Sequence, residues 1–124
     1  MRSLCTVTGL MLIAVLAGGP AQAEEYRPIH DRKAFLSVVE GRALRIALYD
    51  LTLRVGADGA ISGRALGGEV SGKWQWSDGY FCRTMEWAGR KIDADCQLVE
   101  QRGTSALRFT SGKGSGKRAV FRLQ

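Results

Sequence analysis

Two cysteines, Cys82 and Cys96, stand fourteen residues apart in the sequence, and Ala88-Gly89-Arg90 lies midway between them. In a hairpin folded about Gly89 the two cysteines are direct cross-strand neighbours, the separation at which a disulfide closes without moving the backbone. The spacing therefore predicts a strand pair linked by a disulfide. It also predicts an oxidising compartment, because disulfides persist mainly outside the cytosol.

The amino-terminal segment has the pattern of a secretory signal peptide, predicted over residues 1–23. Arg2 supplies the positive charge, residues 10–17 form an apolar run, and Ala21-Gln22-Ala23 fits a small-x-small cleavage site. The apolar run is shorter than the roughly 20 residues of a spanning helix. We expect cleavage after Ala23 and a periplasmic or secreted mature chain, residues 24–124, without a transmembrane segment.

The mature chain is basic, with 17 Lys and Arg against 12 Asp and Glu once Arg2 is removed with the signal. A chain of this size forms one domain around a single core. Positive charge favours an anionic partner, so an envelope component or a periplasmic protein is the expected partner. Nucleic acid is not expected, because export separates the protein from it and no nucleic-acid-binding motif is present.

The pattern of apolar residues predicts one short helix followed by strands. Residues 31–40 combine the capping residue Asp31 with an apolar face, and Gly41 ends the segment. Asp58-Gly59 is the strongest hairpin signal. Strands are predicted at about 44–48, 51–55, 61–65, 70–76, 80–87, 95–101, 107–109 and 119–123. This pattern predicts a mainly β fold, a small eight-stranded antiparallel up-and-down barrel, with a two-sheet sandwich as the alternative.

Alternation along the strands predicts which aromatic side chains face the interior. We place Trp74 and Trp76 inside the barrel. Folding the chain about Asp78 then sets Trp76 opposite Tyr80, and it sets Trp74 opposite the first cysteine. In this register Trp74, Trp76 and Tyr80 line the predicted mouth of the barrel.

The opposite face of the same strand carries a second set of large side chains, Phe81, Arg83, Met85 and Trp87. One interpretation is structural: the helix at 31–40 covers this stripe, or a bulge rotates part of it inward. The other is functional: an exposed aromatic stripe centred on Arg83 recognises a partner, since Trp, Tyr and Arg dominate interface hot spots.

Basic side chains are also predicted on the outer wall, namely Arg54, Arg64, Lys73, Arg83, Arg108, Arg118 and Arg122. Such a row attracts anionic surfaces such as lipid head groups or acidic glycans. Outward charges also keep strand edges from pairing with other chains, which is a purely structural role.

Residues suited to catalysis, metal binding or cofactor binding are sparse. His30 is the one histidine and precedes the predicted helix, while Asp93 and Asp95 lie in the loop between the cysteines. With both cysteines in a bridge, zinc lacks ligands. The glycine-rich residues 112–117 have the wrong spacing for a phosphate loop and lead into a strand, not a helix. We therefore expect no enzyme, no metal and no cofactor.

The chain resembles a group of small exported proteobacterial proteins without an established role. The resemblance is carried by the Trp-x-Trp and Gly-Tyr-Phe-Cys-Arg elements between Gly72 and Arg83 and by Cys96-Gln97, and it covers nearly the whole mature chain. Some members carry the label dihydrodipicolinate reductase, an enzyme that is cytoplasmic, much longer and built on a nucleotide-binding βαβ unit. This sequence shows none of those features, so no catalytic residue is carried over.

Three functions follow as expectations, in this order. The first is noncatalytic association with an envelope component or a protein partner through the face of Phe81, Arg83, Met85 and Trp87. The alternative is a carrier of a small hydrophobic ligand in the barrel interior. The third is an enzyme, which would depend on His30 or on the pair Asp93 and Asp95.

Overall fold

The computed structural model of the chain describes residue 3, residues 9–14 and residues 25–124. Most of the predicted signal peptide, residues 1–23, and its cleavage site lie outside the described residues. The folded part begins with β1 (Arg27–Pro28). Of the helices that are described, none combines the length and apolar character needed to cross a membrane.

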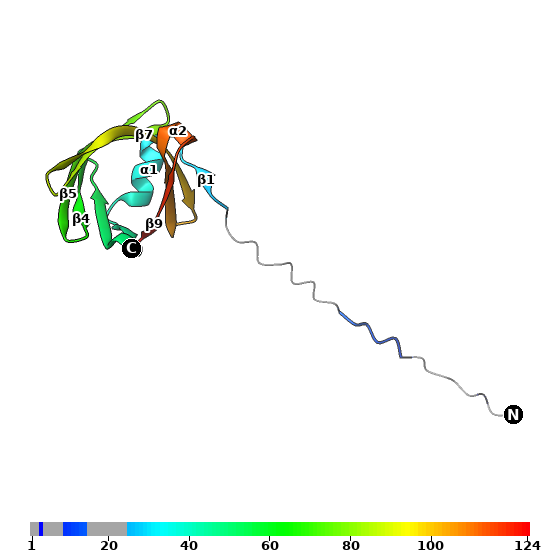
Figure 1. Cartoon of the computed structure of the whole chain (residues 1–124). Coiled ribbons are helices and arrows are strands. Elements are labelled where there is room, and N and C mark those ends of the chain that lie inside the picture. The colour runs from blue at the N-terminus through cyan, green and yellow to red at the C-terminus, as the bar shows by residue number, and fades with distance from the viewer. Residues whose placement is uncertain (1–2, 4–8, 15–24) are drawn as a thin grey trace.

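Eight antiparallel strands close into a barrel, as Figure 1 shows. Each strand pairs with the next along the chain, and the last pairs with the first. The barrel strands are β2 (Leu44–Ile46), β3 (Leu51–Val55), β4 (Ala60–Ala65), β5 (Gly68–Ser77), β6 (Tyr80–Trp87), β7 (Arg90–Arg102), β8 (Ala106–Thr110) and β9 (Arg118–Leu123). The predicted eight-stranded barrel is confirmed over the sandwich, and β1 adds a short ninth strand beside β7.

Helix α1 (Arg32–Val39) falls within the residues for which the sequence predicts a helix. The Asp31 carboxylate accepts a hydrogen bond from the Ala34 backbone N–H at 2.7 Å and so caps the first turn. Phe35 and Val39, four residues apart, are buried on the same helical face. In Figure 1 this helix lies within the ring of strands.

The connections of an up-and-down barrel alternate between its two ends, and α1 closes one of these ends. The Arg32 side chain donates a hydrogen bond to the Ala57 carbonyl in the β3–β4 turn. After the helix, Arg42 donates to the Thr104 carbonyl in the β7–β8 turn. These two turns lie at the same end, so the helix spans it. The 3₁₀ helix η1 (Ala47–Tyr49) lies in the β2–β3 connection, and the short α2 (Ser111–Gly114) lies in the β8–β9 connection.

The register of the β5–β6 hairpin differs by one residue from the predicted one. Trp76 lies opposite Phe81, and Cys82 lies opposite Gln75. The turn has two central residues, Asp78 and Gly79, both with left-handed φ of 51° and 86°, which is the geometry that matches strand twist in tight hairpins. Because side chains alternate along a strand, a shift of one residue exchanges the two faces of β6.

The predicted outer stripe of Phe81, Arg83, Met85 and Trp87 therefore points inward, and its assignment to the outer face is wrong. The prediction that Arg83 belongs to the basic outer wall is wrong for the same reason. Arg54, Arg64, Lys73, Arg118 and Arg122 are exposed as predicted, while Arg108 is half-buried.

The predicted disulfide between Cys82 and Cys96 is confirmed as a direct cross-strand pair. It lies on the outer face of β6, not against a tryptophan as expected. The β6–β7 turn has two central residues, Ala88 and Gly89, and a bulge after Arg83 inserts one extra residue in β7. The shorter turn and the bulge offset each other, so the cysteines still meet.

Candidate functional site

An aromatic cluster fills the end of the barrel beneath α1. The Phe35 ring is fully buried. Its centroid lies 5.2–5.3 Å from the ring centroids of Trp74, Trp76 and Phe81. Phe109 of β8 lies 6.4 Å from the same ring and 5.3 Å from Phe81. This end is therefore filled by side chains, so Trp74 and Trp76 line a closed end of the barrel and not an open mouth.

The three indole N–H groups each find a backbone acceptor. Trp74 Nε1 donates to the Gly56 carbonyl at 2.9 Å, and Trp76 Nε1 donates to the His30 carbonyl at 3.1 Å. Trp87 Nε1 donates to the carbonyl of Ala65, in β4, at 2.8 Å. These bonds fix the orientation of the rings and remove the penalty of burying an unpaired donor.

Below the aromatic cluster the interior contains a cavity of about 160 Å³. Its buried lining residues are apolar, and the remaining lining residues are half-buried. The buried lining residues are Leu44, Leu53, Val55, Ile61, Phe81, Phe109 and Phe121, and the half-buried ones are Arg83, Met85, Gln97 and Ala119. The two polar side chains in the lining, Arg83 and Gln97, are therefore both half-buried.

Arg83 contributes a half-buried cationic side chain to the lining of this cavity. Its Nη1 donates to the Asp93 carbonyl, the one hydrogen bond that this side chain makes among the described residues. Burial lowers the pKa of Arg83, and the negative charge of Asp95 partly opposes that shift. A guanidinium stays protonated at neutral pH and carries five N–H donors, so most of its donors have no partner within the described part of the chain.

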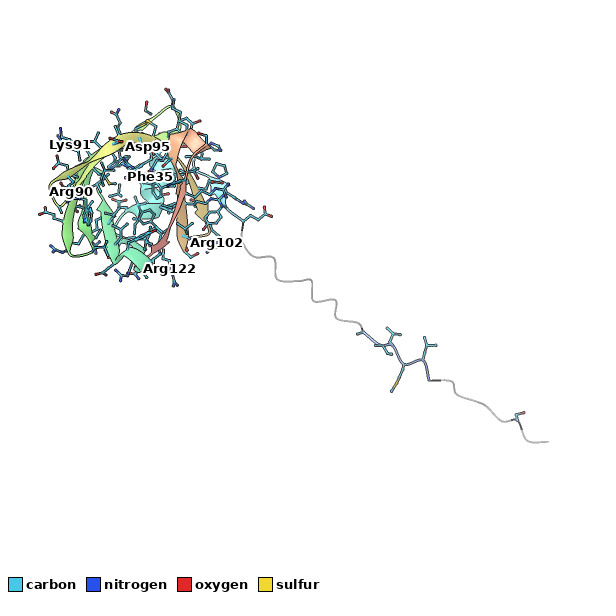
Figure 2. The ribbon with its side chains drawn as sticks, viewed as in Figure 1. Phe35, Arg90, Lys91, Asp95, Arg102 and Arg122 are labelled. Carbon is cyan, nitrogen blue, oxygen red and sulfur yellow. A yellow bond between two sulfur atoms is a disulfide. The ribbon has the colours of Figure 1, made fainter. Side chains whose placement is uncertain are left out.

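Asp95 lies directly across the β6–β7 pair from Arg83 but is held by other groups. One of its oxygens accepts a hydrogen bond from the Gly112 backbone N–H of α2 at 3.1 Å. Burial alone raises the pKa of Asp95, but hydrogen bonds from Gly112, Ser111 and Gln97, with the charge of Arg83, lower it overall. In Figure 2 Asp95 lies next to α2.

Among the described residues, no carboxylate forms a direct ion pair with the Arg83 guanidinium. Within residues 25–124, the ion pairs closer than 4.0 Å are Arg45–Asp50 and Arg108–Glu100. The positive charge in the cavity wall is therefore offset only at longer range by Asp95. This leaves a half-buried cation in a lining that is apolar apart from Arg83 and Gln97.

The structure brings three of the four residues of the predicted stripe, Phe81, Arg83 and Met85, together in the cavity wall. The fourth, Trp87, packs against the core near the far end of β6. Tyr80, predicted at the barrel mouth, lies instead on the outer face, with Lys113 Nζ 5.5 Å from its ring centroid. Gln97 and the apolar walls from β2, β3, β4, β8 and β9 were not predicted as site residues, although strand alternation places these apolar side chains inside.

The residues weighed for catalysis do not converge. His30 is exposed and interacts through its backbone carbonyl, and Asp93 is exposed and contacts Arg83 through its backbone as well. Across the described residues, no three His, Cys, Asp or Glu side chains gather in a way that could hold a metal ion.

The barrel end opposite α1 exposes apolar side chains. Leu48 is 81% exposed and Leu66 is 64% exposed, and Tyr49 between them is about half exposed. The Leu66 backbone N–H donates to the Tyr49 carbonyl at 3.2 Å, so the β2–β3 and β4–β5 connections are in contact. We call these three residues the apolar rim. Arg90 and Lys91, at the tip of the β6–β7 hairpin, lie at the outer edge of the molecule (Figure 2).

No protein-family model, no curated protein and no solved structure matches this chain. The inference of function therefore depends on the residues and geometry described above.

Proposed function

We propose that this chain is a noncatalytic binding protein whose barrel interior holds a small, mainly apolar ligand. The observation that supports the proposal is the cavity of about 160 Å³ beneath Phe35, with apolar walls and two polar side chains, Arg83 and Gln97. Apolar cavities with a few convergent polar groups are the usual ligand sites of small domains.

The size of the cavity limits the ligand. An engineered cavity of about 150 Å³ in another protein binds benzene, so a ligand of roughly six to eight heavy atoms suits this one. Small ligands of this kind bind with free energies that correspond to dissociation constants on the order of 1 mM. Helix α1, which closes one end of the barrel, and the disulfide fix the walls of the cavity. The cavity therefore requires little reorganisation to accept a ligand.

The absence of catalysis and the exported location are parts of the same proposal. The lowered pKa of Asp95 is opposite to the raised value that a general acid needs. The signal-like residues 1–23 support export, and the Cys82–Cys96 disulfide suits an oxidising compartment.

The test is chemical-shift mapping by NMR with hexan-1-ol as the probe. We expect saturable shifts at Phe81, Phe109 and Phe121, and we expect Ala119→Leu, which fills the cavity, to abolish them. Ala60→Leu adds the same volume at an exposed position of β4 and serves as the matched control. Absence of saturable shifts in the wild type, or equal shifts in Ala119→Leu, would contradict the proposal.

A second candidate function is association with an anionic lipid surface of the envelope, favoured by the apolar rim. Leu66 is exposed, and its φ of 49° is in the left-handed region, which leucine adopts at an energetic cost. Leu48, Leu66 and Tyr49 suit insertion at a bilayer interface, and Arg90 and Lys91 at the neighbouring hairpin suit anionic head groups.

Acidic residues limit the electrostatic part of this second function, because Glu69 and Glu86 lie across the strand pairs from Arg64 and Lys91. Apolar insertion must therefore provide most of the binding. We expect the wild type to sediment with phosphatidylglycerol vesicles and Leu66→Asn to sediment several-fold less. Equal sedimentation of the two proteins, or none with the wild type, would remove this candidate.

A further inference from the structure

We infer that the ligand of the barrel interior is an amphipathic anion, a short apolar chain that carries one carboxylate, and that Arg83 binds the carboxylate. This inference rests on the proposed function and names its ligand class. It follows from three observations about Arg83: its position, its unused donors and its surroundings.

The position of Arg83 is set by β6. The inward side chains of that strand run from Phe81, beneath α1, through Arg83 to Met85. Phe81 is buried, whereas Arg83 and Met85 are half-buried. Arg83 is therefore a half-buried member of the lining beside buried apolar side chains, and an amphipathic ligand with its chain beneath Phe35 would place its head group beside Arg83.

The donors of Arg83 are mostly unused. The side chain donates to the Asp93 carbonyl, and no carboxylate forms a direct ion pair with it within the described residues. Half-burial of a cation is unfavourable unless hydrogen bonds and an opposite charge compensate for it. A carboxylate matches the planar fork of a guanidinium with two parallel hydrogen bonds, which a neutral hydroxyl cannot supply.

The carboxylate of Asp95 carries a negative charge that repels an anionic ligand, but groups of α2 bind this carboxylate. Its carboxylate accepts a hydrogen bond from the Gly112 backbone N–H of α2 at 3.1 Å, and the side chains of Ser111 and Gln97 help to lower its pKa. These donors stabilise the negative charge of Asp95 and hold it at the α2 side of the site. Removal of that charge should therefore strengthen binding of an anion while leaving the apolar contacts in place.

The experiment compares hexanoate with hexan-1-ol, two probes with the same six-carbon chain, by NMR titration at pH 7, where the carboxylate is ionised. We expect the wild type to bind hexanoate about tenfold or more tightly than hexan-1-ol. In Arg83→Met this preference should disappear, and hexan-1-ol should bind at least as well as hexanoate. Arg83→Lys should retain part of the preference, because a point charge remains without the fork.

The control is Arg122→Met, which removes the same charge from the exposed outer face of β9 and should leave both affinities unchanged. The amide spectrum of each variant verifies that the barrel is folded. Equal affinities of the wild type for the two probes would overturn the carboxylate inference and leave the proposed function standing. Binding of neither probe would overturn both. A preference for hexanoate that survives in Arg83→Met would also reject Arg83 as the binding group.

Discussion

At the scale of single residues, the direction in which Arg83 points decides which function the molecule can have. On the outer face it would form part of a docking stripe, but on the inner face it lines a cavity. The sequence contains the signal that separates these outcomes, because Asp78-Gly79 is a dipeptide typical of two-residue hairpin turns. The predicted register instead centred the turn on Asp78 alone. This differs from the observed register by one residue and therefore assigns every β6 side chain to the wrong face.

Leu66 gives a prediction at this scale. It precedes Gly67 in the β4–β5 turn, and both residues have left-handed φ, 49° and 77°. Asn-Gly is the preferred pair for such a turn, so Leu66→Asn should stabilise the protein by about 0.5–1 kcal/mol. For a domain of about 100 residues this raises Tm by a few degrees, measured by thermal unfolding.

Leu66→Ala is the matched control for this prediction. It removes the exposed apolar side chain but keeps a Cβ atom in the left-handed region, so it should not give a comparable gain. If Leu66→Asn leaves Tm unchanged or lowers it, the turn is not strained as described.

At the scale of elements, the barrel strands and their order could be predicted because each strand carries its own alternation and each turn except the β2–β3 connection contains a glycine. The first half of β7, residues 90–94, was missed because the predicted loop between the cysteines has a polar composition. The bulge after Arg83 was not predictable from local pattern, since it depends on pairing with β6. The closed end was missed for the same kind of reason, because only the assembled barrel shows that α1 fills it.

Helix α1 gives the prediction at the scale of elements. Phe35 is fully buried and touches rings from β5, β6 and β8, so Phe35→Ala should lower the free energy of unfolding by about 3–5 kcal/mol. This is a large part of the 5–15 kcal/mol typical of a domain. Urea denaturation measures it, with Ser37→Ala on the exposed side of the helix as the control. A loss below about 1 kcal/mol would show that α1 does not anchor the barrel.

At the scale of the whole molecule, Asp95 joins the β6–β7 hairpin to α2 and makes stability depend on pH. Burial alone disfavours its ionised form, but the hydrogen bonds from Gly112, Ser111 and Gln97 and the charge of Arg83 lower its pKa in the folded state. Ionised Asp95 therefore stabilises the fold at pH values above the unfolded pKa of about 3.9, and this contribution is lost as pH falls through the lower folded pKa.

We therefore expect Asp95→Asn to destabilise the protein at pH 7 and to make its stability less sensitive to pH below about 4. The free energy of unfolding, measured in urea at pH values from 7 down to 3, tests this. Asp93→Asn is the control, since Asp93 is exposed and contacts Arg83 through its carbonyl. An Asp95→Asn variant whose pH profile parallels that of the wild type would contradict the role assigned to Asp95.

The most direct test of the central claim, that the interior beneath α1 is the binding site, is a set of intermolecular nuclear Overhauser effects with bound hexanoate. We predict contacts from its terminal methyl group to the rings of Phe109 and Phe121, and from the methylene next to the carboxylate to the side chain of Arg83. Contacts confined to outward residues such as Thr84 or Tyr80, or no contacts in a folded protein saturated with the probe, would contradict the claim.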